Sequence, residues 1–234
     1  MTLTDQLTRV LRWYINPSFR LILRKTSSYL SSQKEQTTWR SGSLVQTPPI
    51  MALNGKLNIP NRFITTHDAN GKAIIDTTIP APAPFYELGK GDAFFAQCYV
   101  TEGFPTSLDG AADLSVYQGY LDRPPGLTIS NGTVLRYVDI PPDFTSPMHR
   151  TVSLDYGVLL EGAVDLVLDS GETRAMRRGD VCVQRATMHA WRNTSLTEWA
   201  RMLYVLQPCK AFAVGGEEAV KEDYGGMKGV KASE

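Results

Sequence analysis

The chain has 234 residues, of which 42% are hydrophobic and 21% charged, and its 24 basic and 24 acidic residues balance. This composition is typical of a globular protein with one ordinary domain plus tails, or two small domains, and a zero net charge gives no electrostatic reason for a nucleic-acid partner. Three cysteines without CxxC or CxC spacing argue against a disulfide framework or a thiolate zinc site, and no apolar run approaches the roughly 20 residues of a membrane span.

The first fifty residues differ from the rest in charge. They contain seven basic and two acidic residues, a balance of +5, so the remaining chain has 17 basic and 22 acidic residues, or −5. Leu7, Val10, Leu11 and Tyr14 recur at helical spacing. We therefore expect a basic extension over residues 1–50, either a mitochondrial transit peptide, a disordered tail or a helix that docks on the folded domain or a second subunit. The expected location is cytoplasmic, with mitochondrial as the alternative if this extension is a transit peptide.

Between residues 61 and 126 the sequence predicts short strands and a long loop. Residues 62–66 and 73–76 flank an Asn-Gly turn, the signature of a hairpin. Three prolines make residues 79–84 an extended connector rather than a central strand. Residues 94–101 predict a strand, and the Gly-, Pro- and Asp-rich stretch that follows to Gly126 predicts a loop that packs in part over the domain.

From residue 132 the predicted strands lie close together. Their expected ranges are 133–140, 154–168 (interrupted by two glycines), 172–176, 181–184, 189–193 and 200–206. Short strands at regular turn spacing, with no helical pattern between them, predict a β-sandwich or barrel. The chain from 209 to 234 is Gly-rich and charged, so we expect a tail that buries little.

Two motifs in this region resemble those of the cupin family, G-x5-H-x-H-x3–4-E-x6-G and G-x5-P-x-G-x2-H-x3-N. The stretch from His149 to Gly162 resembles the first motif, and Gly179 to Asn193 resembles the second. Residues 63–73 are similar to the opening strand and turn of single-domain cupins from bacteria and fungal secondary-metabolite clusters. The resemblance covers about residues 60–208. It implies an all-β fold, a single cupin-type antiparallel β-barrel (jelly roll) with an extended N-terminal segment.

The resemblance also implies a metal site, because typical cupins bind Fe, Mn, Ni or Zn through three histidines and a glutamate of these motifs. Here Thr151 stands in place of the second histidine and Asp155 in place of the glutamate. His149, Asp155 and His189 remain, and two histidines with one carboxylate are enough for a facial triad that binds a divalent metal. The same three side chains could instead catalyse proton transfer without a metal. Both a metal cofactor and no cofactor stay open.

Other residues near the motifs are candidates for substrate binding. Tyr156 and Trp191 could line a pocket for a flat apolar ligand, and Arg185 or Arg150 could bind a substrate carboxylate. The alternatives are aromatic core packing for the first two and salt bridges to neighbouring acidic residues for the arginines.

Three functions are compatible with these residues. The first is a lyase or isomerase that decarboxylates, dehydrates or isomerises a hydrophobic oxygenated metabolite, in secondary-metabolite biosynthesis. The second is an iron-dependent dioxygenase that uses His149, Asp155 and His189 as ligands. The third is a ligand-binding cupin without catalysis. The expected partners are a small-molecule substrate and, through the extended segment 74–85, a second copy in a homodimer; no DNA-binding helix pair is apparent in the sequence.

Overall fold

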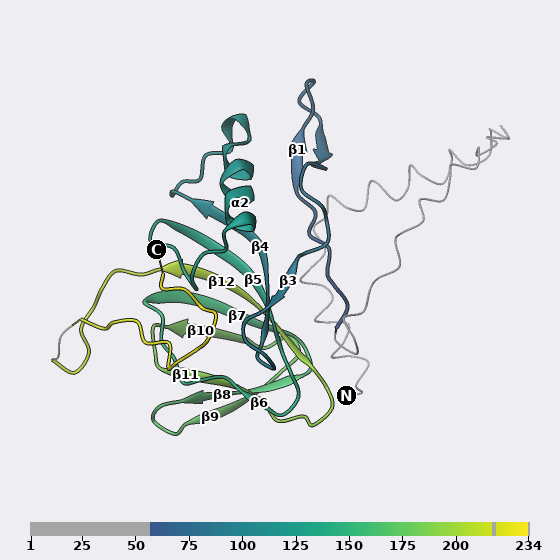
Figure 1. Ribbon diagram of the computed structural model, residues 1–234. Coiled ribbons are helices and arrows are strands. Elements are labelled where there is room, and N and C mark those ends of the chain that lie inside the picture. Colours follow the sequence, from purple (N-terminus) through teal and green to yellow (C-terminus); the bar gives the residue numbers. More distant parts are fainter. Residues whose placement is uncertain (1–56, 217–218, 234) are drawn as a thin grey trace, which may run out of the picture. The chain divides into compact units, whose positions relative to one another are not determined.

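The computed structural model describes residues 57–216 and 219–233, so the expectations for residues 1–50 lie outside the described residues (Figure 1). Strands dominate. In chain order they are β1 (Thr65–His67), β2 (Ala73–Ile75), β3 (Phe85–Glu87), β4 (Phe94–Glu102), β5 (Gly132–Ile140), β6 (Phe144–Thr145), β7 (Ser153–Glu161), β8 (Ala163–Leu168), β9 (Thr173–Arg177), β10 (Val181–Arg185), β11 (His189–Asn193) and β12 (Ala200–Pro208).

The strands form a hairpin and two larger antiparallel sheets. The hairpin is β1-β2, the six-stranded sheet has the order β10-β7-β12-β5-β4-β3, and the four-stranded sheet has the order β6-β11-β8-β9. Gly162, with a φ of +75°, turns the chain between β7 of the larger sheet and β8 of the smaller one, where a Cβ would collide with the backbone at Trp199 and Ala200. The antiparallel all-β cupin fold expected from the motifs is confirmed.

One hydrophobic core joins the inner faces of the two sheets. Leu159 and Met202 of the six-stranded sheet pack in the same cluster as Val164, Met176 and Trp191 of the four-stranded sheet. Side chains alternate between faces along each strand, so every second residue of β5, β7 and β12 points toward this core. That alternation determines which polar residues of the six-stranded sheet are enclosed.

Residues 109–122 are helical, which corrects the expectation of a loop there. A 3₁₀ turn, η3 (Asp109–Ala111), leads into helix α2 (Ala112–Asp122), which stands beside β4 (Figure 1). Tyr117 is fully buried and its hydroxyl donates to the Gln97 carbonyl at 2.8 Å. The helix escapes sequence reasoning because its first residue follows a left-handed Ala111 without a side-chain cap. No helix of the described residues has the length and apolarity needed to cross a membrane.

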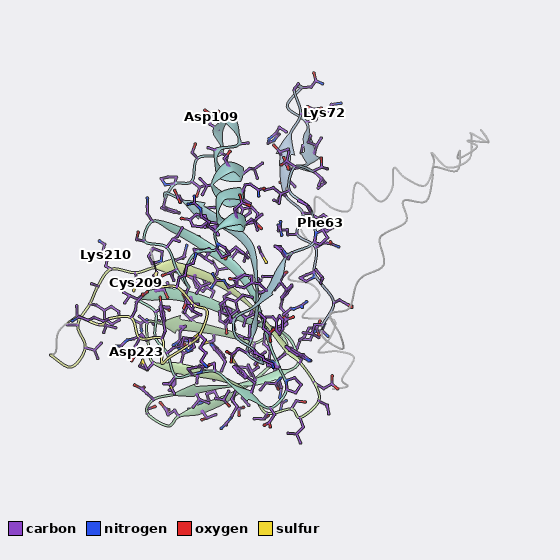
Figure 2. All side chains as sticks on the ribbon, viewed as in Figure 1. Phe63, Lys72, Asp109, Cys209, Lys210 and Asp223 are labelled. Carbon is purple, nitrogen blue, oxygen red and sulfur yellow. The ribbon has the colours of Figure 1, made fainter. Side chains whose placement is uncertain are left out.

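Residues 219–233, here called the C-terminal strap, lie against the sheets, although none of them is buried. Asp223 and Arg150 exchange two backbone hydrogen bonds, at 2.6 and 2.9 Å, and Figure 2 shows Asp223 close to the strands. Tyr224 and Val230 contact the cluster around Phe95. The strap is Gly-rich because it approaches the domain closely: at Gly225 and Gly229, both of positive φ, a Cβ would collide with backbone carbonyls. The same glycines predicted a tail that buries little.

Candidate functional site

A cavity of about 400 Å³ is lined by residues of both sheets and by residues 226–228 of the strap. Its apolar wall includes Phe95, Leu127, Val138 and Leu206. His149, Asp155, His189 and Trp191 of the sequence-predicted site residues also line it. The structure therefore brings four of the six predicted residues to one enclosure of a size that holds a small organic molecule.

The two histidines lie side by side. Their ring centroids are 4.2 Å apart, and their backbones exchange two hydrogen bonds of 2.9 Å in an isolated bridge between β11 and the segment before β7. The His149 ring lies 2.8 Å from the Pro147 carbonyl through Nδ1. Since a carbonyl only accepts, Nδ1 carries the hydrogen and Nε2 holds the lone pair of the neutral ring.

His189 is positioned more tightly. Its Nδ1 lies 2.9 Å from both the Thr187 carbonyl and the Gln184 side-chain amide, so either tautomer finds a partner there. Burial lowers the pKa of His189 to about 3, and the charge of His149 adds to this effect. Burial also lowers the pKa of His149. The lowered pKa values keep both imidazoles neutral near pH 7.

Asp155 points inward from β7 at another part of the cavity wall. Burial raises its pKa to about 7, although Ser153, Thr151 and the charge of Arg136 favour the ionised form. The Thr151 hydroxyl donates to Oδ2 at 3.5 Å, whereas the buried Oδ1 has no hydrogen-bond partner. This carboxyl can therefore donate or accept a proton at neutral pH.

Two further buried polar atoms of the cavity wall also lack a partner. They are Nε of Arg136 on β5 and the hydroxyl of Tyr204 on β12. Buried polar groups are nearly always hydrogen-bonded in folded proteins, so three unpartnered atoms around one cavity are unusual. Such a set is typical of a site that a ligand completes.

The expected metal triad is not assembled. Within residues 57–216 and 219–233, no three His, Cys, Asp or Glu side chains come together closely enough to hold an ion. The charge that acts on His189 is that of His149, whereas the charge acting on Asp155 is that of Arg136. Thr151 has replaced one ligand of the family pattern, and an aspartate reaches one methylene less far than a glutamate. These residues do not fit a three-ligand metal, and only the histidine pair remains as a ligating group.

Tyr156 and Arg185 do not line the cavity. Tyr156 follows Asp155 on β7 and faces the opposite side of the sheet, where it is 40% exposed. Arg185 is exposed at the end of β10. Arg150 donates through Nε to the Lys221 carbonyl of the strap at 2.8 Å. The substrate-binding roles expected of these arginines thus have no counterpart in this cavity.

Comparison with known proteins identifies the family. The chain is 47% identical over 162 residues to phomopsin biosynthesis cluster protein C' of Diaporthe leptostromiformis, which covers 69% of this chain and 85% of that protein. It is 38% identical over 184 residues to cupin-domain-containing oxidoreductase virC of Hypocrea virens, which covers 78% of this chain and 91% of that protein. This chain belongs to the cupin family.

Comparisons with family models and with solved structures gave the following results for this cupin. No family model matches the chain. Among solved structures, the cupin domain of Schizosaccharomyces pombe Cnp3 aligns with a TM-score of 0.39 at 12% identity, over 64% of this chain and 88% of that one.

Among the polar residues of the cupin cavity that sequence reasoning missed, Arg136 and Tyr204 are neighbours. They are Cα partners across β5 and β12, so they lie next to each other on the inner face of the six-stranded sheet. A signal for Arg136 exists in the sequence: at period two it shares one face of β5 with Val134 and Val138, which places it on an apolar face of the strand. Arginine is almost never fully buried in proteins unless it is paired.

Proposed function

We propose that this cupin is a lyase or isomerase of secondary metabolism, which transfers protons on a hydrophobic oxygenated small molecule in the cavity. The observation that supports this most is the combination, in one mostly apolar enclosure, of a neutral histidine pair and a carboxyl with an unpartnered oxygen. Groups that differ in proton affinity within one site are what acid–base catalysis requires. The relatives named for biosynthesis clusters support the metabolic setting.

His149 is the proposed base. Its Nδ1–H is held by the Pro147 carbonyl, so Nε2 presents its lone pair. Nε2 removes a proton from a carbon next to a substrate carbonyl, the C–H electron pair forms a C=C bond, and the carbonyl oxygen gains the negative charge. His189 would stabilise this oxygen: when its Nδ1 accepts from Gln184 Nε2, its Nε2 carries the hydrogen and can donate it.

Asp155 is the proposed acid. In its protonated form it delivers a proton to a second carbon, which completes an isomerisation, or to a hydroxyl that leaves as water, which completes a dehydration. The cycle ends with His149 protonated and Asp155 ionised, and proton exchange with water restores both. The raised pKa of about 7 keeps a protonated fraction of Asp155 at neutral pH.

A second candidate is an oxidoreductase, because relatives at 38–41% identity carry that word in their names. The histidine pair could bind a divalent metal through its imidazole nitrogens, and such a metal would supply redox chemistry. The ligand set of this chain supports that candidate less well, since a third ligand does not lie with the pair among the described residues.

The experiment that tests the proposal needs no knowledge of the natural substrate. The protein is incubated in D₂O with a panel of hydrophobic enolisable ketones, β-hydroxy ketones and β-keto acids. Deuterium uptake, water loss and CO₂ release are followed by mass spectrometry. We expect at least one reaction to be catalysed, and His149→Ala or Asp155→Asn to slow it by roughly 10²–10⁴-fold.

Tyr156→Phe is the matched control, because Tyr156 neighbours Asp155 on β7 but lies outside the cavity lining; it should keep the wild-type rate. An unreactive panel, or full activity in both site variants, would contradict the proposal. Metal content measured on the same samples separates the candidates. Metal that disappears together with activity in the histidine variants would favour the oxidoreductase.

We also propose that the protein is a homodimer that pairs through the segment 74–85. Ile74 and Ile75 are 45% and 52% exposed, and within the described residues β1 and β2 pair with each other alone. Light scattering at roughly 10–50 µM should give a dimer, a concentration at which a micromolar complex forms. Ile75→Asp should yield a monomer, while Val214→Asp, at another exposed apolar position, should not. A wild-type monomer would refute the dimer.

A further inference from the structure

Arg136 is a buried cation to which no carboxylate is hydrogen-bonded in the part of the chain that the structure describes. Its side chain is 2% exposed. Nη2 donates to the Gln97 side-chain oxygen at 3.1 Å and to the Gly126 carbonyl at 2.8 Å, and the guanidinium lies 4.8 Å from the centroid of the Phe95 ring. These partners are all neutral. The charge of Asp155 acts on the guanidinium, but no hydrogen bond joins the two, so Nε is left without an acceptor.

The neighbour of Arg136 on the same face is a second unpartnered donor. Tyr204 is its Cα partner across β5 and β12, and side chains opposite each other in this way lie in contact range. The Tyr204 hydroxyl and Arg136 Nε are both buried without a hydrogen-bond partner. Two adjacent donors with no acceptor call for an oxygen that accepts from both.

The charges around the cavity favour a negative ligand. The lining contains three cations, Arg136, Lys90 and Lys228, and two carboxyls, Asp92 and Asp155, so it stays positive even with both carboxyls ionised. The rest of the wall is largely apolar and aromatic. A ligand that matches both features is a hydrophobic molecule with one anionic oxygen group.

We propose that the substrate of this cavity carries a carboxylate, which Arg136 and Tyr204 hold while its hydrophobic part packs toward Trp191. The proposal rests on the proposed function only in taking the cavity as the substrate site. The side chain that binds the substrate carboxylate is then Arg136, on the inner face of β5, and not Arg150 or Arg185. A carboxylate accepting from Arg136 Nε and the Tyr204 hydroxyl would give both atoms the partner they lack.

Binding of two matched probes tests the proposal on the wild-type protein. The probes are 4-butylbenzoate and 4-butylbenzamide, which have the same size and apolar body and differ in charge. Isothermal titration calorimetry should give at least tenfold tighter binding of the benzoate. Equal affinities, tighter binding of the amide, or binding of neither probe at 5 mM would each overturn the proposal.

Substitutions test which side chain causes the preference for the benzoate over the amide. Arg136→Gln should abolish the preference for the acid, and Tyr204→Phe should reduce it severalfold. Arg174→Gln, on the exposed face of β9 where Arg174 pairs with Glu172, is the control and should leave the preference intact. A preference that persists in Arg136→Gln would overturn the assignment. If that variant does not fold, the decisive measurement remains the comparison of acid and amide on the wild type.

The outcome is separable from that of the proposed function. An acid preference without deuterium uptake, elimination or decarboxylation would retain the carboxylate subsite and refute proton-transfer catalysis. Catalysis on neutral ketones without any preference for the acid probe would retain proton-transfer catalysis and refute the carboxylate subsite.

Discussion

Two buried arginines on the six-stranded sheet have opposite surroundings. On the outer face, Arg201 of β12 lies opposite Asp139 of β5, and two hydrogen bonds of 2.6 Å join guanidinium and carboxylate. Arg201 also donates to the Asn58 carbonyl and lies over the Phe85 and Tyr137 rings. On the inner face, Arg136 has no carboxylate within hydrogen-bonding distance among the described residues and keeps an unpartnered Nε.

The difference teaches which buried charge serves the fold and which serves the cavity. A hydrogen-bonded pair such as Arg201–Asp139, with Arg201 also in contact with Asn58 and with Phe85 of β3, needs no ligand. Arg136 and Asp155 stand on the cavity side, each with an unsatisfied atom, and they are not hydrogen-bonded to each other. Natural proteins tolerate such costs mainly at functional sites.

The largest expected effect is a difference in the free energy of unfolding between variants of Arg201 and of Arg136. Arg201→Met leaves Asp139 buried without its cation and should lower the free energy of unfolding by about 3–5 kcal/mol. Arg136→Met removes a charge to which no carboxylate is hydrogen-bonded and roughly conserves the side-chain volume, so its cost should be at least about 2 kcal/mol smaller. Urea unfolding monitored by circular dichroism measures both. Arg178→Ala, which breaks the exposed pair with Glu161, is the control and should cost less than about 1 kcal/mol. Equal losses in the two arginine variants would refute the distinction.

The next effect concerns Asp155 and pH. Its pKa is raised from 3.8 to about 7 in the folded state, so the folded protein binds more protons than the unfolded chain between these values. Stability should therefore fall as the pH rises from about 4 to 7, and Asp155→Asn should remove this loss. From pH 5 to pH 8 the variant should gain roughly 3 kcal/mol relative to wild type. Thermal unfolding at several pH values measures the gain, and Tyr156→Phe should follow the wild-type curve. A constant difference between Asp155→Asn and wild type would contradict the buried carboxyl.

His189 should act in the opposite direction. Its pKa is lowered to about 3 in the folded state, so the unfolded chain binds the extra proton below pH 6.5 and stability falls as the pH decreases. The loss at pH 5 is about 2 kcal/mol. His189→Gln, which cannot take up a proton, should flatten the acid side of the stability curve. The same curve for His67→Gln, at the exposed end of β1, is the comparison, and an unchanged acid slope in His189→Gln would count against a buried neutral imidazole.

The sequence predicted the two histidines of the cavity but not its arginine. His149 and His189 stand in motifs whose spacing is local, so their place in the fold follows from strand register. The inward direction of Arg136 and the outward direction of Tyr156 follow from the same alternation of side chains along β5 and β7. What the sequence does not contain is the pairing order: β5 lies between β12 and β4, and only that order places Arg136 beside Tyr204.

The packing of the strap could not be predicted from the sequence for a different reason. Gly225 and Gly229 are typical of flexible chain when considered locally, and their role depends on carbonyls of Met148 and Leu88, at 77 and 141 positions away in the chain. Helix α2 likewise depends on Tyr117 reaching the Gln97 carbonyl of β4. Such contacts are non-local, so composition alone indicated a loop and a tail where the structure has a helix and a strap.

The smallest expected effect is at the strap, which lines the cavity near Arg136 and does not contribute to the Arg201–Asp139 pair. Gly225→Ala places a methyl group against the Met148 carbonyl at a positive φ, so the strap should dock less often while the sheets stay intact. Global stability should fall by about 1 kcal/mol or less, because few apolar groups leave the core. Hydrogen–deuterium exchange should accelerate in residues 219–233 and remain slow in β5 and β12. Gly215→Ala, also at positive φ but with open space around its Cβ, is the control for backbone strain alone.

Since residues 226–228 line the cavity, release of the strap should also weaken benzoate binding, whereas the Arg201–Asp139 pair should be unaffected. Acceleration in β12 equal to that in the strap would mean that the strap supports the whole sheet and is not a cover of the cavity.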